Sequence, residues 1–318
     1  MKIGVIGSGA VGSACLLALV LRGSARQIVV LNRDRKRARA IAMDIGYGAS
    51  LAPIVEISDG DYPDLAGSEL VVIAAGTNEK GGGATDRGDP AGRLRLLETN
   101  VAVFKDILPR LSQVASDVLV LVLTDPPDPL ADLVRTAGFT RVLSSGTYLD
   151  SLRFRHQLAR RLSVAPASVD ANVLGEHGTS EVFMWSSARV GTAPALDLME
   201  GAGVDHQELR RSVEHDVRYA NIAIIEGNQA SQYGIGIVAA RIVEAVLRDE
   251  RVVMPVGSYN PTYGVTLSMP SVVGRAGVLK ILEPSMSEEE RHALERSAET
   301  LRGAVARYVT KSDNDRRV

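Results

Sequence analysis

Hydrophobic positions in the first half of the chain form short, largely apolar runs that alternate with amphipathic stretches. The runs are rich in Val and Ile, as strands buried on both faces of a parallel sheet are. They cover residues 2–7, 27–32, 70–76, 118–124 and 141–146. Helices are predicted between or after them at residues 11–22, 35–47, 93–114 and 129–137. This alternation predicts right-handed crossovers and a doubly wound parallel α/β sheet.

The pattern changes after about residue 148, where longer helical stretches and strand-like segments follow one another. Helices are predicted at residues 150–162, 206–226, 236–248 and 287–308, and strand-like pieces at 251–260 and 265–274. We therefore predict a dinucleotide-binding domain at residues 1–147 and an α+β substrate domain at 148–318. No Pro- or Ser-rich linker separates the halves, so a broad shared interface is expected, and the polar residues 311–318 are expected to fray.

Composition narrows the class of protein. The chain has 318 residues, 45% of them hydrophobic, which is enough for a large core in one or two domains. A formal net charge of −2 gives no field that would attract nucleic acid or an acidic membrane surface. The longest apolar run near the N-terminus has eight residues, too few for a bilayer span of about 20. The single cysteine, Cys15, lies in the first predicted helix, so we expect no disulfide, no metal centre and a cytoplasmic setting.

A glycine-rich turn joins the first predicted strand to the first predicted helix. Gly7, Gly9 and Gly12 have the spacing of a dinucleotide fingerprint, and this context is the one that the fingerprint requires. Gly7 permits the tight turn, Gly9 lets the backbone approach a pyrophosphate, and Gly12 lets the helix pack closely on the strand. The helix N-terminus at Ala10 and Val11 would then offer free N–H groups to the phosphates.

The end of the second strand lacks the acidic residue that usually binds the adenine ribose. Asn32 occupies that place, 20 residues beyond Gly12, and Arg33 and Arg35 follow it. Asparagine does not repel a 2′-phosphate, and guanidinium groups suit phosphate oxygens. The sequence therefore favours NADP(H). The alternative is NAD(H), with Asn32 as a weaker ribose ligand and the arginines in a solvated helix start.

Three separate stretches carry residues suited to acid–base chemistry and anion binding. Asp150 and Arg153 lie three residues apart, on one face of a predicted helix. His177 lies in a "GEHG" turn after a strand-like run, and Arg93 begins a helix directly after a glycine-rich loop. An imidazole titrates near neutral pH, so it can both donate and accept a proton. Without the "LGEHG" element, Asp150 and Arg153 would be interpreted as an ordinary ion pair at the start of a helix.

With "GVIGSGAVG" at the N-terminus, the motifs "LDSLRFR" and "LGEHG" resemble those of the lactate/malate dehydrogenase family over nearly the whole chain. The resemblance implies a Rossmann domain followed by a substrate domain, a homodimer or homotetramer, and hydride transfer between nicotinamide C4 and C2 of a 2-oxo or 2-hydroxy acid. It also implies that His177 exchanges a proton with the substrate oxygen and that Asp150 orients the imidazole. Arg153 would clamp the substrate carboxylate, and Arg93 would polarise the carbonyl.

The loop at residues 76–93 has six glycines in eighteen residues and is expected to act as a lid that closes over the substrate. Gly76, at its start, is assigned to the cofactor side. In the family this loop carries the residue that sorts substrates. Counting back from Arg93 puts Arg87 in that place and favours a dicarboxylate such as oxaloacetate. Counting forward from Gly76 puts Glu79 there, which would disfavour one. We favour Arg87.

Two further positions are expected at the substrate. The family reads Asn-Pro-Val-Asp where this chain has "TDPPD", so Asp125 replaces a residue that lies near the nicotinamide. An ionised Asp accepts hydrogen bonds but donates none, which suits a substrate bearing a donor group, although Asp125 could also simply cap a turn. Ser231 and Gln232, in "GNQASQYGIG", are implied to line the pocket.

The sequence thus predicts an NAD(P)H-dependent 2-oxo acid reductase with a malate-dehydrogenase-like lid. A specialised reductase of a larger or amine-bearing 2-oxo acid is a second hypothesis. A dinucleotide-binding protein without catalysis is the third, and the presence of all four of His177, Asp150, Arg153 and Arg93 argues against it.

Overall fold

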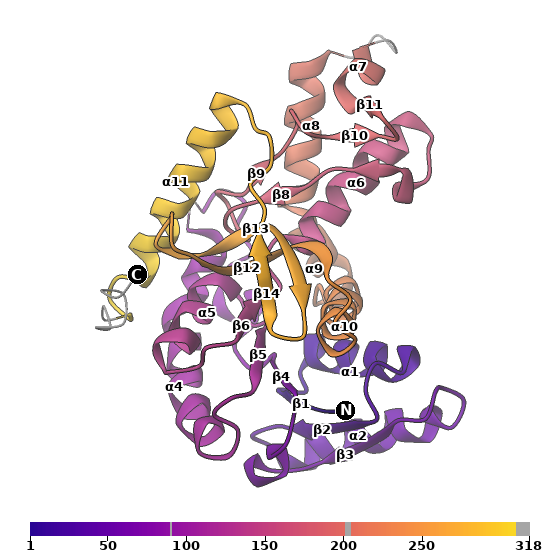
Figure 1. Cartoon of the computed structure of the whole chain (residues 1–318), viewed down its shortest axis with the longest axis vertical. Coiled ribbons are helices and arrows are strands. Elements are labelled where there is room, and N and C mark those ends of the chain that lie inside the picture. Colours follow the sequence, from indigo (N-terminus) through magenta and orange to yellow (C-terminus); the bar gives the residue numbers. More distant parts are fainter. Residues whose placement is uncertain (90, 201–204, 310–318) are drawn as a thin grey trace.

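The computed structural model describes residues 1–89, 91–200 and 205–309, and its centre is a nine-stranded sheet (Figure 1). The strand order is β14-β13-β12-β6-β5-β4-β1-β2-β3. The six strands of the first half pair in parallel. They are β1 (Lys2–Ile6), β2 (Gln27–Leu31), β3 (Glu56–Asp59), β4 (Leu70–Ile73), β5 (Leu119–Val122) and β6 (Val142–Ser144). The predicted doubly wound α/β fold is confirmed.

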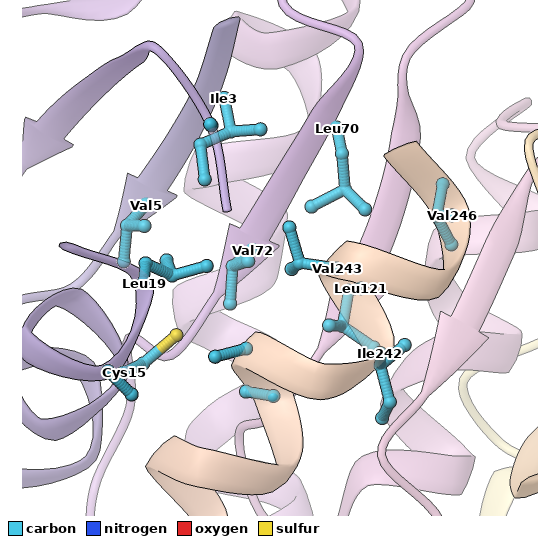
Figure 2. Close-up of a cluster of buried hydrophobic side chains, with 14 of the residues drawn as sticks. Ile3, Val5, Cys15, Leu19, Leu70, Val72, Leu121, Ile242, Val243 and Val246 are labelled. Carbon is cyan, nitrogen blue, oxygen red and sulfur yellow. The ribbon is translucent and has the colours of Figure 1, made fainter. Parts of the chain in front are cut away.

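Helices cover both faces of the parallel strands because neighbouring strand residues point to opposite faces. The helices are α1 (Ala10–Arg22), α2 (Arg35–Ala49), α4 (Leu97–Val114) and α5 (Pro127–Thr136). Leu70 and Val72 of β4 join a core with α1 and with α10 (Tyr233–Leu247), as Figure 2 shows. Val71 and Ile73 join the opposite core, with α4 and α5.

The second half of the chain extends this same sheet. Its strands are β12 (Val252–Asn260), β13 (Val265–Gly274) and β14 (Gly277–Ile281), all antiparallel to their neighbours. β12 joins β6 at Gly257 and Ser144. Two small sheets add β7 (Val169–Asp170), β10 (Arg189–Val190) and β11 (Ala193–Pro194), and β8 (Val173–Leu174) with β9 (Val182–Phe183). The other helices are α6 (Tyr148–Leu162), α7 (Ala195–Glu200), α8 (His206–Arg218), α9 (Ala220–Asn228) and α11 (Glu288–Val305).

The two halves meet where α10 packs against α1. A Cβ at Gly236 of α10 would lie 2.7 Å from the carbonyl carbon of Ala14, so only glycine permits this approach. α10 follows directly on the segment that carries Ser231 and Gln232, while α1 follows the glycine-rich turn. The shared interface expected from the missing linker is therefore close backbone packing between these helices.

The structure differs from the sequence prediction in several elements. β3 was not predicted because it is a half-exposed edge strand with a polar sequence, EISD. The single helix predicted at 206–226 is two helices, which meet at Tyr219. The helix predicted to begin at Arg93 begins at Leu97, after a 3₁₀ turn at Gly92–Leu96. Within the lid, a short helix α3 (Glu79–Gly82) forms, capped by the Asn78 side chain.

Within the described ranges, no single helix is long and apolar enough to cross a bilayer. Only α9 and α10 taken together meet that measure by length and composition, and they are bent by 119° relative to each other. The expected fraying of residues 311–318 lies outside the described residues.

Candidate active site

His177 lies in the turn between β8 and β9, and its backbone is fixed to the large sheet. Its N–H donates to Asp128 Oδ2 at 3.0 Å, and Asp128 Oδ1 accepts from Ser144 Oγ of β6 at 2.5 Å. Burial raises the pKa of Asp128 to about 6, although both of these hydrogen bonds act to lower it. Asp128 stands in the "TDPPD" stretch, where the family motif ends in Asp, and that position is the sequence signal for it. The histidine is thus positioned through β6 as well as through its own turn.

Asp150, in the first turn of α6, hydrogen-bonds to His177 Nδ1. The side chain of Asp150 is 2% exposed, and Arg153 donates to its other oxygen at 3.0 Å. Burial by itself would raise the pKa of Asp150. The charge of His177, their hydrogen bond, Arg153 and Arg93 outweigh burial and hold that pKa well below its usual range. A charged carboxylate against one ring nitrogen fixes the ring and stabilises the imidazolium form.

Arg153 also extends toward the loop before α10. Its Nη2 lies 3.4 Å from Ser231 Oγ, so Ser231 is brought to the site as expected. Gln232 is half-buried at the start of α10, where its carbonyl accepts from Gly236.

The other ring nitrogen of His177 faces Asp125 and Arg93. His177 Nε2 is 3.8 Å from Asp125 Oδ1, and Asp125 Oδ2 is 3.6 Å from Arg93 Nε. Arg93 is 8% exposed, and its Nε has no hydrogen-bond partner among the described residues. A buried guanidinium nitrogen without an acceptor is costly, so this group is suited to an acceptor that the protein does not itself provide. His177, Asp125, Arg93, Asp150 and Arg153 therefore converge on one place.

The start of the lid is tied to the segment that carries Asp125. Asn100 of α4 is buried; its side chain donates to the Asp125 carbonyl at 2.6 Å and accepts from the Thr77 N–H at 2.7 Å. Nothing in the sequence marked Asn100, because it lies inside a regular helix. Gly76 belongs to this joint, since a Cβ there would lie 2.4 Å from the Thr124 side chain.

Glu79, at the start of α3, lies within electrostatic range of this site. Burial and the charge of Asp125 raise the pKa of Glu79, while Arg93 and His177 act to lower it. The next residue, Lys80, donates to the Gln229 side chain in the loop after α9. This contact holds α3 against the part of the chain that carries Ser231.

Arg87 is not brought to the site. Its side chain is 41% exposed and forms a bidentate pair with Glu226 of α9, at 2.7 and 3.0 Å. The structure therefore gives no support to Arg87 as the residue that receives a second substrate carboxylate. The count forward from Gly76, which places Glu79 at the sorting position, stays a prediction.

A further acid near the site, Glu181, went unpredicted. It is buried, its Oε1 lies 3.7 Å from Arg218 Nε, and burial raises its pKa well above the ordinary value. Glu181 lies only a few residues after the "GEHG" turn, and this position is the sequence signal that could have identified it as a site residue. Across the described residues, no group of three or more His, Cys, Asp or Glu side chains is arranged to hold a metal ion.

The glycine-rich turn fits a pyrophosphate. Gly7 has φ +102°, and a Cβ on Gly12 would lie 1.8 Å from the Gly7 carbonyl oxygen, so both positions need glycine. A Cβ on Gly9 would meet nothing within 4 Å, so the backbone there borders open space. No side chain caps α1, and the first-turn N–H groups at Ala10 and Val11 have no partner within a helix.

The arginines after β2 are arranged differently from the expectation. Arg35 Nε donates to Asp59 at 3.1 Å, and this hydrogen bond lowers the pKa of Asp59. Asn32 donates to the Ser8 side chain in the glycine-rich turn at 2.9 Å, and Arg33 is exposed. The pairing of Arg35 with Asp59 weakens the case for NADP(H), because it engages one of the two arginines expected at a 2′-phosphate.

Comparisons with known proteins agree with this geometry. Residues 1–142 match the NAD binding domain of lactate/malate dehydrogenase, and residues 147–311 match its alpha/beta C-terminal domain. An L-lactate dehydrogenase of Deinococcus radiodurans is 43% identical over 95% of this chain and 98% of its own length. One from Thermus aquaticus is 43% identical over 96% of this chain and 99% of its own. A minor L-lactate dehydrogenase from Enterococcus mundtii, whose structure is solved, superposes with a TM-score of 0.88 at 30% identity, covering 96% of this chain and 98% of that one.

The chain belongs to the lactate/malate dehydrogenase family. It is an NAD-dependent oxidoreductase acting on CH–OH groups, a 2-hydroxy acid dehydrogenase of that family. This sets aside the hypothesis of a binding protein without catalysis, and the expected NADP(H) preference is not supported by the matched NAD binding domain.

Proposed function

We propose that this enzyme interconverts a 2-oxo acid and its 2-hydroxy acid, with His177 as the acid–base group. The observation that carries the proposal is the convergence of His177, Asp150 and two arginines, one of which has a buried Nε without a partner. When bound, the nicotinamide supplies or accepts the hydride at C2. The chain's own residues then have to handle one proton and hold one carboxylate.

The proton moves between His177 Nε2 and the substrate oxygen. During reduction the imidazolium gives this proton to the former carbonyl oxygen; during oxidation the neutral ring takes it back. Asp150 keeps Nδ1 in place and stabilises the charged ring. Arg93 donates toward the same oxygen as negative charge develops on it.

Arg153 holds the carboxylate of the substrate. It lies 14% exposed at the edge of the site, already oriented by Asp150 and Ser231. A planar guanidinium forms two parallel hydrogen bonds with a carboxylate, which fixes C2 relative to His177.

The experiment is a reduction assay with NADH and a panel of 2-oxo acids, including pyruvate and oxaloacetate, followed by NADH absorbance. We expect pyruvate to be reduced faster than oxaloacetate, because Arg87 lies at the surface with Glu226 and Glu79 lies within electrostatic range of the site. Absence of turnover with every 2-oxo acid would contradict the proposed function.

For the cofactor we propose NAD(H). The match to an NAD binding domain supports NAD(H), and so does the ion pair between Arg35 and Asp59. Because Arg33 follows an uncharged Asn32, we expect NADP(H) to be accepted as a second cofactor. Steady-state kcat/KM with NADH and NADPH tests this choice, and a higher value with NADPH would reinstate the original expectation.

We also propose that the enzyme is a homodimer. Exposed apolar side chains gather on α1 and on the helix α10 that packs against it: Leu17, Leu21, Tyr233 and Ile237 are 45%, 62%, 62% and 57% exposed. Large exposed apolar side chains on two helices that pack together favour an interaction site there. Light scattering on the native protein and on Ile237→Asp measures the outcome: a dimer for the first and a monomer for the second.

A further inference from the structure

The β6–β12 cavity, of about 290 Å³, lies where these two strands of the large sheet part, and none of its lining residues belongs to the candidate active site. β6 and β12 are antiparallel, and among the described residues only Gly257 and Ser144 pair between them. The residues after Gly257 and those before Ser144 therefore run side by side without pairing as strands. They line the cavity: Ser258 and Tyr259 on one side, and Thr140, Arg141 and Val142 on the other.

Two further elements complete the walls of the β6–β12 cavity. Arg135, in the last turn of α5, lines it, and so do residues 276–281, which form most of β14. The pairing of β13 with β14 contains a register shift, and a bulge of this kind bends a strand. A Cβ at Gly277 would lie 3.5 Å from the side chain of Leu119 in β5, so the start of β14 reaches across the sheet. The cavity is thus enclosed between the parted strands and β14.

The lining is positively charged. It contains Arg135, Arg141 and Lys280, and no Asp or Glu. Asp132 Oδ1 lies 3.5 Å from Arg135 Nε and offsets that charge. Arg141 donates to two backbone carbonyls, at 3.3 and 2.5 Å. Within the described ranges, no carboxylate lies within 4.0 Å of the charged nitrogens of Arg141 or Lys280, so two positive charges of the cavity have no carboxylate partner.

Two buried polar atoms of the lining residues also lack partners. Ser258 is 7% exposed, and neither its Oγ nor Arg141 Nε has a hydrogen-bond partner among the residues that the structure describes. Both groups can donate a hydrogen bond. Buried polar groups in proteins are nearly always satisfied, and leaving one without a partner is unfavourable. An acceptor that enters the cavity would relieve this cost.

The charge and the size of the cavity favour a small dianion. A phosphate monoester carries about −1.5 to −2 at pH 7, which matches two positive charges, whereas a single carboxylate would match only one. A guanidinium also suits phosphate oxygens. The volume lies near the lower end of the range for small-molecule sites. Val142, Val278 and Ile281 supply apolar wall for the organic part of such a ligand.

We propose that the β6–β12 cavity binds the phosphate group of a small phosphate monoester, with Arg141, Lys280 and Ser258 as donors. The ligand takes no part in hydride transfer, and the inference does not depend on the proposed function. It adds a second anion site to a chain whose other candidate anion ligands are the glycine-rich turn, Arg93 and Arg153.

The test is calorimetric titration of the enzyme saturated with NADH, so that the glycine-rich turn is occupied. Phenyl phosphate and phenyl sulfate are the probes, because they differ in charge but hardly in shape. Above neutral pH, we expect phenyl phosphate to bind about tenfold or more tightly than phenyl sulfate. Equal affinities, or no binding of phenyl phosphate, would overturn the proposal.

Inorganic phosphate, as a third probe, separates a free phosphate from a monoester. Because part of the wall is apolar, phenyl phosphate should bind more tightly than inorganic phosphate. Equal or tighter binding of inorganic phosphate would overturn the assignment to a monoester.

Lys280→Gln removes one charge from the cavity. The affinity for phenyl phosphate should fall roughly tenfold, and its preference over phenyl sulfate should shrink. Lys105→Gln is the matched control, because Lys105 is exposed on α4 and does not line the cavity, so the affinity should stay unchanged. An affinity that Lys280→Gln leaves unchanged would overturn the proposal, because the anion would then bind elsewhere.

Ser258→Ala tests the hydroxyl without loss of fold. The substitution removes a buried group that has no partner, so the free energy of unfolding should not decrease. The affinity for phenyl phosphate should nevertheless fall severalfold. Urea unfolding and the same titration measure the two effects. Wild-type affinity in this variant would contradict the role given to Ser258.

Discussion

The two sides of this active site differ in how completely their polar groups are satisfied. On the relay side, His177, Asp150 and Arg153 are bonded to one another, and Asp128 ties the histidine backbone to β6. On the lid side, Arg93 Nε lacks a hydrogen-bond partner among the described residues. The comparison indicates that the fold builds the proton-handling machinery in advance and leaves the lid side to be completed by the substrate.

The change with the largest expected effect breaks the relay side. His177→Asn removes the acid–base group, so kcat/KM for pyruvate should fall roughly 10²- to 10⁴-fold. Absorbance of NADH under steady state measures it. Binding of NADH, followed by its fluorescence, should stay unchanged and serves as the control. Turnover close to the wild-type rate would contradict the role of His177.

The substitution Asp128→Asn tests the relay side through the pH dependence of the free energy of unfolding. The folded-state pKa of Asp128 is about 6 against an ordinary value of 3.8, so its stabilising contribution is present below about pH 4 and is lost as pH rises through 6. The asparagine keeps an acceptor for His177 N–H and gains a donor toward Ser144. Wild type should therefore lose about 2 kcal/mol of stability relative to the variant between pH 4 and pH 7. Urea unfolding of both proteins across that range measures the difference, and parallel pH curves would exclude it.

Arg153→Lys tests the point where the relay side meets the substrate. A lysine keeps the charge but loses the planar fork, so KM for pyruvate should rise roughly ten- to a hundredfold with a smaller change in kcat. Full steady-state curves separate the two constants. If kcat fell while KM stayed constant, Arg153 would act on the chemistry rather than on the carboxylate.

The smallest effect is expected from Arg87→Gln, on the lid side. Arg87 pairs with Glu226 at the surface, so the ratio of oxaloacetate to pyruvate reduction should change less than about twofold. Competition assays with both substrates give this ratio. A selective loss of oxaloacetate reduction would instead bring Arg87 into the site and reverse our account of the lid.

The relay side could be predicted from sequence because local structure fixes its geometry. Asp150 and Arg153 share a helix face by their spacing, and the glycines of the N-terminal turn need their positions for steric reasons. The five buried strands were recognisable from their apolar runs. The edge strand β3 carries too few apolar residues to give the same signal.

The lid side could not be predicted in the same way. The loop at residues 76–93 has no periodic pattern, so counting from either end gives different residues. Only the structure shows that Arg87 pairs with Glu226 at the surface. The partnership of Arg35 with Asp59 was equally hidden, because it joins the first residue of α2 to the last residue of β3, which sequence spacing does not relate.

The contact between Gly236 and Ala14 has a mechanical consequence. The backbones of α1 and α10 touch here. This contact leaves no room for a hinge between the glycine-rich turn, which receives the dinucleotide, and the segment that carries Ser231. We therefore expect access for substrate and release of product to depend on the loop at residues 76–93.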